Sequence, residues 1–213
     1  MKIYVSGGAK NGKSTLAQNL AVLCSKYEDM AISSIGVPDD VGPRAQELPL
    51  YYVATMIPTD EEDRIRIMRH REDRSGLGFK TVERPKDLSR IVTPDGGHNC
   101  GYGDSNCDPH GVYLIDSVTA LLSNVMFPPH EDFNPHAAEE VKKDLAAFLS
   151  KVDHAIFVSD YIYADAGKKT DAEDYTDTYM RGLAYIDRSI AKLCDELIEV
   201  SSGIAIHHGE GTA

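Results

Sequence analysis

The sequence predicts an α/β domain in which a mainly parallel β-sheet is flanked by helices. Short segments rich in β-branched and aromatic residues alternate with segments of helical periodicity. With 213 residues, the chain is long enough for one domain with a good core, which we expect to span residues 1–213. The third observation is a glycine-rich segment, GGAKNGKS at residues 7–14, which matches G-x-x-x-x-G-K-[ST] between an expected strand and an expected helix. Together these features predict a P-loop NTPase-like fold.

The expected elements alternate along the chain. Strands are expected at residues 2–6, 50–55, 79–83, 112–116, 154–159, 197–200 and 204–206, with a less readable candidate at 31–37. Helices are expected at residues 14–24, 59–74, 85–91, 117–127, 135–151 and about 179–193. Thr59 and Asn134 are the expected N-caps of two helices, and Pro135 suits a first helical position. Residues 93–111, rich in Gly, Asn, Asp, Cys and His, are predicted to form a surface insertion.

Charge and composition exclude several classes of protein. The net charge of −12 argues against general binding to nucleic-acid backbones. No apolar run approaches the length of a membrane span. Because Met1-Lys2 leads directly into the first expected strand, we expect no signal peptide, and the four cysteines do not resemble a disulfide framework. We therefore expect a cytoplasmic protein without nucleic-acid or membrane partners.

The glycine-rich segment has the residue types that a polyphosphate requires. Glycine lets the backbone bend so that successive N–H groups converge on the phosphates. Lys13 would reach the terminal phosphates, the Ser14 hydroxyl would ligate Mg²⁺, and the following helix would add its dipole. The alternative is a glycine-rich turn that binds nothing. The expected nucleotide-binding residues of this segment are Gly7, Gly8, Ala9, Lys10, Asn11, Gly12, Lys13, Ser14 and Thr15.

Asp116 is a second candidate magnesium ligand. It ends the apolar strand expected at 112–116, where a P-loop protein places the acidic residue that helps to hold Mg²⁺. Acidic residues often follow strands, so this pattern alone is weak evidence for a magnesium ligand. The P-loop in the same chain strengthens it.

A basic segment in the helix expected at 59–74 is another candidate for chemistry. It contains Arg66, Arg69, His70, Arg71 and Arg74. Arginine suits phosphate oxygens, and a histidine among arginines could act as a general base or as a nucleophile toward phosphorus. The alternative is a solvated helix face whose arginines pair with Glu61, Glu62, Glu72 and Asp73. Spacing alone leaves both interpretations open.

Three other groups of residues have two interpretations each. His98, Cys100, Cys107 and His110 are suitable ligands for tetrahedral Zn²⁺, but their spacing is not a common finger pattern and such residues collect in loops by chance. Tyr161, Tyr163, Tyr175 and Tyr179 could line a substrate cleft or simply pack in the core or on the surface. His207 and His208 are expected to lie at a surface end.

Several motifs at matching distances resemble the adenosylcobinamide kinase / adenosylcobinamide-phosphate guanylyltransferase family. They are the P-loop, Tyr52-Val53-Ala54-Thr55, Arg66-Ile67 with His70-Arg71 and Arg74, Thr81-Val82-Glu83-Arg84-Pro85, Leu114-Ile115-Asp116-Ser117-Val118-Thr119 with Asn124, Ala191–Leu197, and Ser202-Gly203-Ile204. The P-loop is common to many proteins, whereas a histidine-arginine segment at this distance after an Ala-Thr strand end is far more selective. The resemblance covers most of the chain apart from residues 25–48 and 93–111.

The resemblance implies a cobalamin-assembly enzyme with a P-loop fold that assembles as a trimer. Such enzymes phosphorylate adenosylcobinamide with ATP or GTP and then move GMP from GTP onto that phosphate through a guanylylated histidine. His70 matches this histidine, so the implied catalytic residues are His70, Lys13 and Asp116. Thr55, Arg71 and Glu83 are implied as further nucleotide-binding residues.

The sequence departs from the family pattern at two places. After the fourth main strand the family usually has Asn-Glu-Val-Gly, where this chain has Asp160-Tyr161-Ile162-Tyr163. The family's Arg-Asp and Asn-Gln pairs near the last helix are Met180-Arg181 and Asp187-Arg188 here. Two alternatives therefore stay open beside the bifunctional enzyme: a diverged nucleotide-binding regulator, and a small-molecule kinase with a different acceptor.

Overall fold

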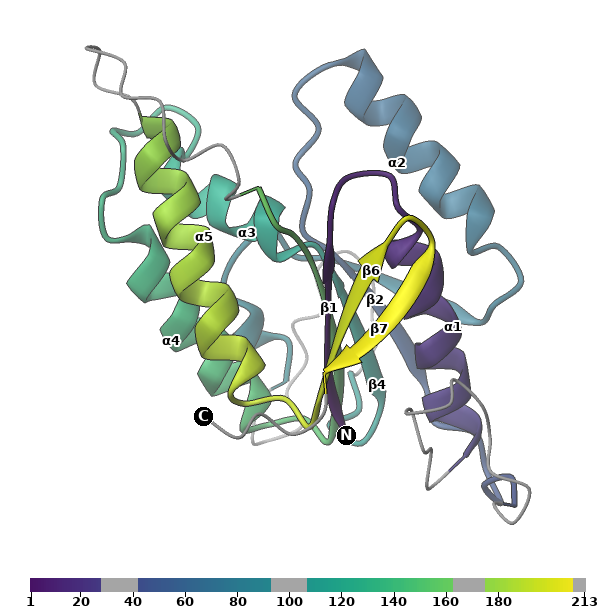
Figure 1. Ribbon diagram of the computed structural model, residues 1–213. Coiled ribbons are helices and arrows are strands. Elements are labelled where there is room, and N and C mark those ends of the chain that lie inside the picture. The colour runs from purple at the N-terminus through teal and green to yellow at the C-terminus, as the bar shows by residue number, and fades with distance from the viewer. Residues whose placement is uncertain (28–41, 93–106, 163–174, 209–213) are drawn as a thin grey trace.

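The structure, a computed structural model, describes residues 1–27, 42–92, 107–162 and 175–208. Within these residues, seven strands form one sheet in the order β3-β2-β4-β5-β1-β6-β7 (Figure 1). The strands are β1 (Lys2–Gly7), β2 (Leu50–Ala54), β3 (Phe79–Glu83), β4 (Val112–Asp116), β5 (His154–Asp160), β6 (Glu196–Ser201) and β7 (Ile204–His208). The helices are α1 (Lys13–Lys26), α2 (Glu61–Asp73), the 3₁₀ helix η2 (Leu88–Arg90), α3 (Val118–Met126), α4 (Ala137–Leu149) and α5 (Tyr175–Ala191).

All neighbouring strands are parallel except β6 and β7, which form an antiparallel hairpin. The hairpin turns through Ser202 and Gly203, which both have positive φ. The prediction of a mainly parallel sheet flanked by helices is confirmed. Because parallel strands end at the same edge of a sheet, the residues that follow β1, β2, β4 and β5 are brought to one side of the molecule.

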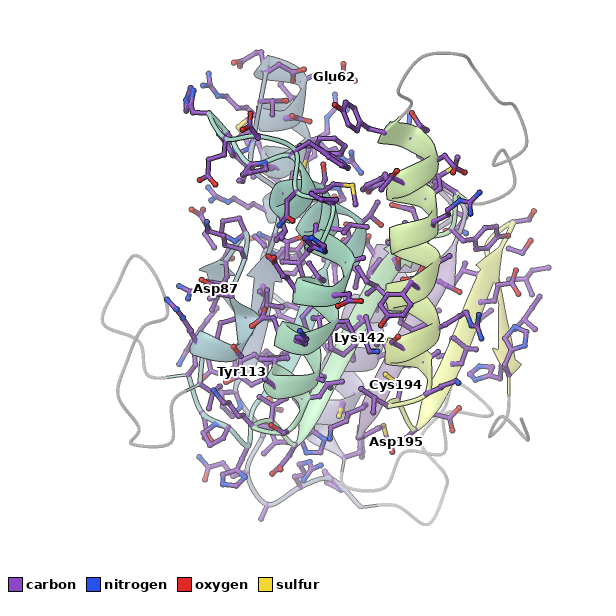
Figure 2. The ribbon with its side chains drawn as sticks, turned by 90° about the vertical axis from the view of Figure 1, so that its left-hand side faces the viewer. Glu62, Asp87, Tyr113, Lys142, Cys194 and Asp195 are labelled. Carbon is purple, nitrogen blue, oxygen red and sulfur yellow. The ribbon has the colours of Figure 1, made fainter. Side chains whose placement is uncertain are left out.

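Helices cover both faces of the sheet. Side chains alternate along a strand, so Ile3 and Val5 pack toward α1, whereas Tyr4 between them lies in the core beneath α3, α4 and α5. Figure 1 shows α1 on one side and the three-helix layer on the other. In that layer α4 lies beside α5 (Figure 2), and the Lys142 Nζ donates a hydrogen bond to the Tyr185 hydroxyl at 2.7 Å.

Helix α2 stands apart from both layers and buries none of its residues. Its sequence explains this exposure, because it is dominated by charged side chains and has no wide apolar stripe. The helix begins after Asp60, whose carboxylate accepts a hydrogen bond from the Asp63 backbone N–H at 2.8 Å. The expected cap, Thr59, instead donates its hydroxyl to the Asp63 carboxylate at 2.7 Å.

Other boundaries also differ from expectation. The helix expected at 85–91 is only the short η2. Helix α4 begins two residues after Pro135, because the Asn134 side chain accepts from the His136 backbone N–H at 2.9 Å before the helix starts. His207 belongs to β7, and both of its ring nitrogens are buried rather than at a surface end. The candidate strand at 31–37 and most of the insertion lie outside the described residues.

Candidate nucleotide site

The glycine-rich segment connects the end of β1 to the start of α1, as its pattern predicts. Gly7 has a φ of 150°, and a Cβ there would collide with the Val200 carbonyl and with the Asn11 side chain. Gly12, the residue before α1, has a φ of 93°, which also favours glycine. The Asn11 amide donates to the Val200 carbonyl and so ties the loop to β6.

Lys13 is the first residue of α1, and its side chain is only 5% exposed. Its ammonium group donates to the Gly8 carbonyl at 2.5 Å and to the Asn11 Oδ1 at 3.3 Å. It also forms an ion pair with the Asp160 Oδ1 at 2.7 Å. Asp160 ends β5, whose register pairs it with Gly7 on the neighbouring strand.

Asp116 ends β4 at the same edge of the sheet. Its Oδ2 accepts a hydrogen bond from the buried Tyr52 hydroxyl on β2 at 3.0 Å. Burial and the nearby Asp116 carboxylate raise the pKa of the Tyr52 phenol above its usual range. The phenol therefore stays protonated and keeps donating to Asp116. The two protein oxygens expected for Mg²⁺, from Ser14 and Asp116, suit a cation that binds through one or two protein ligands plus substrate phosphates.

Thr55 follows β2 and holds this edge together rather than pointing into solvent. Its hydroxyl donates to the Ser117 carbonyl at 2.8 Å and accepts from the Ser117 N–H at 2.7 Å. The Asn124 amide donates to the carbonyls of Thr55 and Pro85, at 2.7 and 3.0 Å. These contacts fix the segments that follow β2, β3 and β4 relative to one another.

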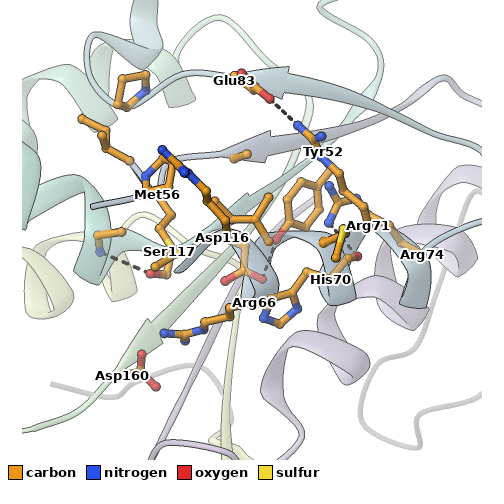
Figure 3. A pocket seen from close by; sticks show the side chains of 18 residues that line it. Tyr52, Met56, Arg66, His70, Arg71, Arg74, Glu83, Asp116, Ser117 and Asp160 are labelled. Atoms are coloured by element: carbon orange, nitrogen blue, oxygen red, sulfur yellow. Dashed lines mark hydrogen bonds and ion pairs between the residues drawn. The ribbon is translucent and has the colours of Figure 1, made fainter. Parts of the chain in front are cut away.

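A pocket of about 570 Å³ lies between this edge of the sheet and α2 (Figure 3). It brings together residues that are far apart in the sequence: His70 and several arginines from α2, Asp116 from β4, Asp160 from β5 and Glu83 from β3. Tyr52, Ser117 and apolar side chains that include Met56, Ile57 and Ile67 complete its walls. His70 and Asp116, predicted separately from the sequence, therefore face one cavity.

The arginines of α2 and its C-cap residue, Arg74, have different partners, which determine what each can contact. Arg74 is buried, stacks at 3.7 Å over the Tyr52 ring, and donates to the His70 carbonyl at 2.7 Å. Burial lowers the pKa of Arg74. Arg71 pairs with Glu83 on β3 at 2.5 Å. Among the described residues, Arg66 has no ion-pair partner, although it lines the pocket.

The solvated-face alternative is correct in the exposure of α2, which buries none of its residues, but wrong in its pairing. Glu61 pairs with Arg64, which is outside the predicted set, and the predicted set makes no pair with Glu61, Glu62, Glu72 or Asp73 among the described residues. Arg71 instead reaches a different element of the fold. Sequence spacing along a helix gives no sign of such a contact.

The structure also places at or behind this site two acidic residues that sequence spacing did not indicate as site residues. Asp160 was notable only as a departure from a family pattern, although it ends an apolar strand in the same way as Asp116. Behind it, the Ser159 hydroxyl donates to the buried Asp187 carboxylate on α5 at 3.0 Å. Burial raises the pKa of Asp187 to about 7.

Of the four tyrosines considered for a substrate cleft, the three in the described part of the chain do not line this pocket. The Tyr161 hydroxyl donates to Glu199 at 3.3 Å, and the Tyr179 hydroxyl donates to the Thr119 carbonyl at 2.9 Å. Tyr175 packs against Phe133, with 4.3 Å between ring centroids. Tyr163 lies outside the described residues.

Of the residues considered for zinc, His98 and Cys100 lie outside the described part of the chain. Cys107 is disulfide-bonded, which the sequence did not predict. His110 contacts the Asp153 carboxylate at 2.6 Å, and this hydrogen bond raises the pKa of His110. The described residues contain no group of three or more His, Cys, Asp or Glu side chains that could hold a metal ion. None of the described helices is long and apolar enough to cross a membrane.

Comparisons with solved structures return proteins that are remote in sequence. The flagellar accessory protein FlaH from Methanocaldococcus jannaschii is 17% identical, with a TM-score of 0.38 over 98% of this chain and 77% of that one. A protein from Pyrococcus horikoshii OT3 is 8% identical, with a TM-score of 0.44 over 98% of this chain and 85% of that one.

Comparisons of sequence are more specific. The bifunctional adenosylcobalamin biosynthesis protein CobU of Escherichia coli (strain K12) is 29% identical over 135 residues. The aligned part covers 63% of this chain and 55% of that protein, little more than half of its length. A family model described as cobinamide kinase / cobinamide phosphate guanyltransferase matches residues 3–208, which confirms the resemblance of the motifs. The chain therefore belongs to the cobinamide kinase / cobinamide phosphate guanyltransferase family.

Proposed function

We propose that this protein is a bifunctional enzyme that phosphorylates adenosylcobinamide and then transfers GMP from GTP to the resulting phosphate through His70. The observation that carries the proposal is that His70, Arg66 and Asp116 line one pocket at the edge of the sheet where the P-loop also lies. The family model supports a kinase or nucleotidyl-transfer role in cobamide assembly. GTP or ATP is the proposed phosphate donor of the first step.

The P-loop side of the site would bind the nucleotide. Its backbone N–H groups and the N-terminus of α1 offer donors and a favourable dipole to the phosphates. Ser14 and Asp116 would hold Mg²⁺, which would offset negative charge on the phosphates and the leaving group. Thr55, Arg71 and Glu83 would act less directly in nucleotide binding, because their contacts position the wall of the pocket.

In the transfer step, His70 would act as the nucleophile. A neutral imidazole keeps a lone pair on one ring nitrogen, and this nitrogen would attack the α-phosphorus of GTP. An N–P bond forms, the bond from the α-phosphorus to the bridging oxygen breaks, and pyrophosphate leaves. The phosphate of the acceptor would then attack the same phosphorus and release His70. Arg66, which has no ion-pair partner among the described residues, has five N–H donors, enough to contact the phosphate oxygens as well as a neighbouring carboxylate.

The experiment is intact-mass spectrometry after incubation with GTP and Mg²⁺. The expected result is a GMP adduct that is labile in acid and stable in base, present in the wild type and absent in His70→Ala. The matched control is His136→Ala, because His136 is exposed and lies outside the pocket. If a protein that binds GTP forms no adduct in either variant, the transferase proposal fails.

The adduct experiment extends to the acceptor. With adenosylcobinamide and labelled nucleotide, labelled product would establish the acceptor, whereas nucleotide turnover without that product would favour a kinase for another small molecule. The departures from the family pattern at Asp160 and Asp187 are the observations that favour this second candidate, a kinase for another small molecule. We further propose a trimeric, cytoplasmic protein, and light scattering of the purified chain tests the trimer.

A further inference from the structure

Every N–H donor of the Lys13 ammonium group has an acceptor in this structure. An ammonium has three N–H donors, and Lys13 has three acceptors: the Gly8 carbonyl, the Asn11 Oδ1 and the Asp160 Oδ1. The group is nearly inaccessible, with 5% of its side chain exposed. A nucleotide phosphate can therefore contact Lys13 only if one of these acceptors leaves.

Asp160 is the acceptor that is able to leave. The Gly8 carbonyl belongs to the loop backbone, and Asn11 is tied to the Val200 carbonyl. Asp160, in contrast, is 28% exposed and lines the pocket. Its backbone N–H donates to the Thr119 hydroxyl at 3.0 Å, so the backbone is anchored while the carboxylate can turn.

The pocket offers the freed carboxylate another cation. Figure 3 shows the Arg66 guanidinium directed toward Asp160, and Arg66 has no ion-pair partner among the described residues. A carboxylate left beside a polyphosphate would be repelled, and a nearby guanidinium would reduce that repulsion. Arg66 is thus placed to take over the carboxylate that Lys13 gives up.

We infer that the Asp160 carboxylate takes the place of a nucleotide phosphate beside Lys13 in the loop without nucleotide. When a nucleoside triphosphate binds, this carboxylate would exchange its ion pair with Lys13 for one with Arg66. This inference rests on the proposed nucleotide site. It makes Asp160 a residue that lowers nucleotide affinity, since binding must first break the Lys13–Asp160 ion pair.

The test measures GTP affinity by calorimetry in the presence of Mg²⁺. Asp160→Asn keeps the size of the side chain but removes its charge, and we expect it to bind GTP about tenfold more tightly, the effect of one charge-assisted contact. Asp177→Asn is the matched control, because it also removes one negative charge but lies outside the pocket, paired with Arg181. The control should bind GTP as the wild type does. Thermal melting verifies that both variants are folded.

A double-mutant cycle tests the second half of the inference. Without Arg66 the freed carboxylate has no cation, so Asp160→Asn should increase the affinity by a larger factor in an Arg66→Gln background than in the wild type. An equal gain in both backgrounds overturns the transfer to Arg66. Unchanged or weaker GTP binding by Asp160→Asn overturns the competition and leaves the proposed function standing. No GTP binding by any variant, the wild type included, overturns both.

Discussion

Replacing Asp187 by asparagine should stabilise the protein, and the gain should grow as the pH rises. Asp187 lies on α5 with 8% of its surface exposed. The Ser159 hydroxyl on β5 donates to its carboxylate at 3.0 Å. The buried Tyr4 hydroxyl on β1 faces the same carboxyl but has no hydrogen-bond partner of normal geometry among the described residues. The other titratable groups nearby, Asp160 and Cys194, carry no positive charge.

This environment disfavours the ionised form of Asp187. Burial raises its pKa from 3.8 to about 7, and the neighbouring Asp160 carboxylate acts in the same direction. A difference of about 3 units between the folded and unfolded pKa values lowers the free energy of unfolding by at most about 4 kcal/mol, at about 1.4 kcal/mol per unit. Because the folded pKa lies above the unfolded one, the unfolded chain loses its proton first as the pH rises. The free energy of unfolding therefore falls between about pH 4 and pH 7 and then levels off.

Urea unfolding of the wild type and Asp187→Asn at pH 5 and pH 8 measures this effect. Asparagine has nearly the same shape and never ionises, so it does not incur the cost of a buried charge. We expect the difference in unfolding free energy to shift by about 3 kcal/mol in favour of the variant between the two pH values. Asp177→Asn, on the exposed side of the same helix, should show no such shift. A difference that is independent of pH would refute the reasoning.

Three other outcomes are expected. Lys13→Ala should weaken GTP binding by at least about tenfold, because a charge-assisted contact is lost; calorimetry that gives an unchanged affinity would remove the P-loop assignment. Gly7→Ala should destabilise the fold by about 2 kcal/mol or more in urea unfolding, since its φ is positive and a Cβ would collide with the backbone of β6, whereas Gly8→Ala meets open space and should be nearly neutral. If the insertion binds zinc under reducing conditions, metal analysis should find about one Zn²⁺ per chain, lost in Cys107→Ser, and a folded, metal-free protein would favour the plain loop.

Local patterns in the sequence were sufficient for the class of fold and for the P-loop. The alternation of apolar strands with helical periodicity depends on neighbours within a few residues, and the structure confirms the parallel sheet. The glycines at 7 and 12 have the backbone conformations that their motif requires. Asp116 was likewise expected at a strand end, because parallel strands place such residues at one edge.

Contacts between residues that are distant in the sequence could be determined only from the folded chain. The cap of α2 at Asp60 differs from expectation by one residue, because the Asp60 carboxylate accepts from the Asp63 N–H, whereas the Thr59 hydroxyl donates to the Asp63 carboxylate. The pairing of Arg71 with Glu83 joins two elements, and only the packing of β3 near α2 determines it. Spacing along the sequence gives no information about such contacts.

Tertiary packing also determines the surroundings of two carboxylates near the P-loop, those of Asp160 and Asp187. Lys13 and Asp160 are separated by most of the chain, and they meet because β1 and β5 are adjacent in register. The sequence marked Asp187 only as a departure from a family pattern and gave no sign of its burial, which results from the packing of α5 on the sheet. The physical reason is that periodicity specifies which face of an element is apolar, whereas the charge state of a buried group depends on which other elements surround it.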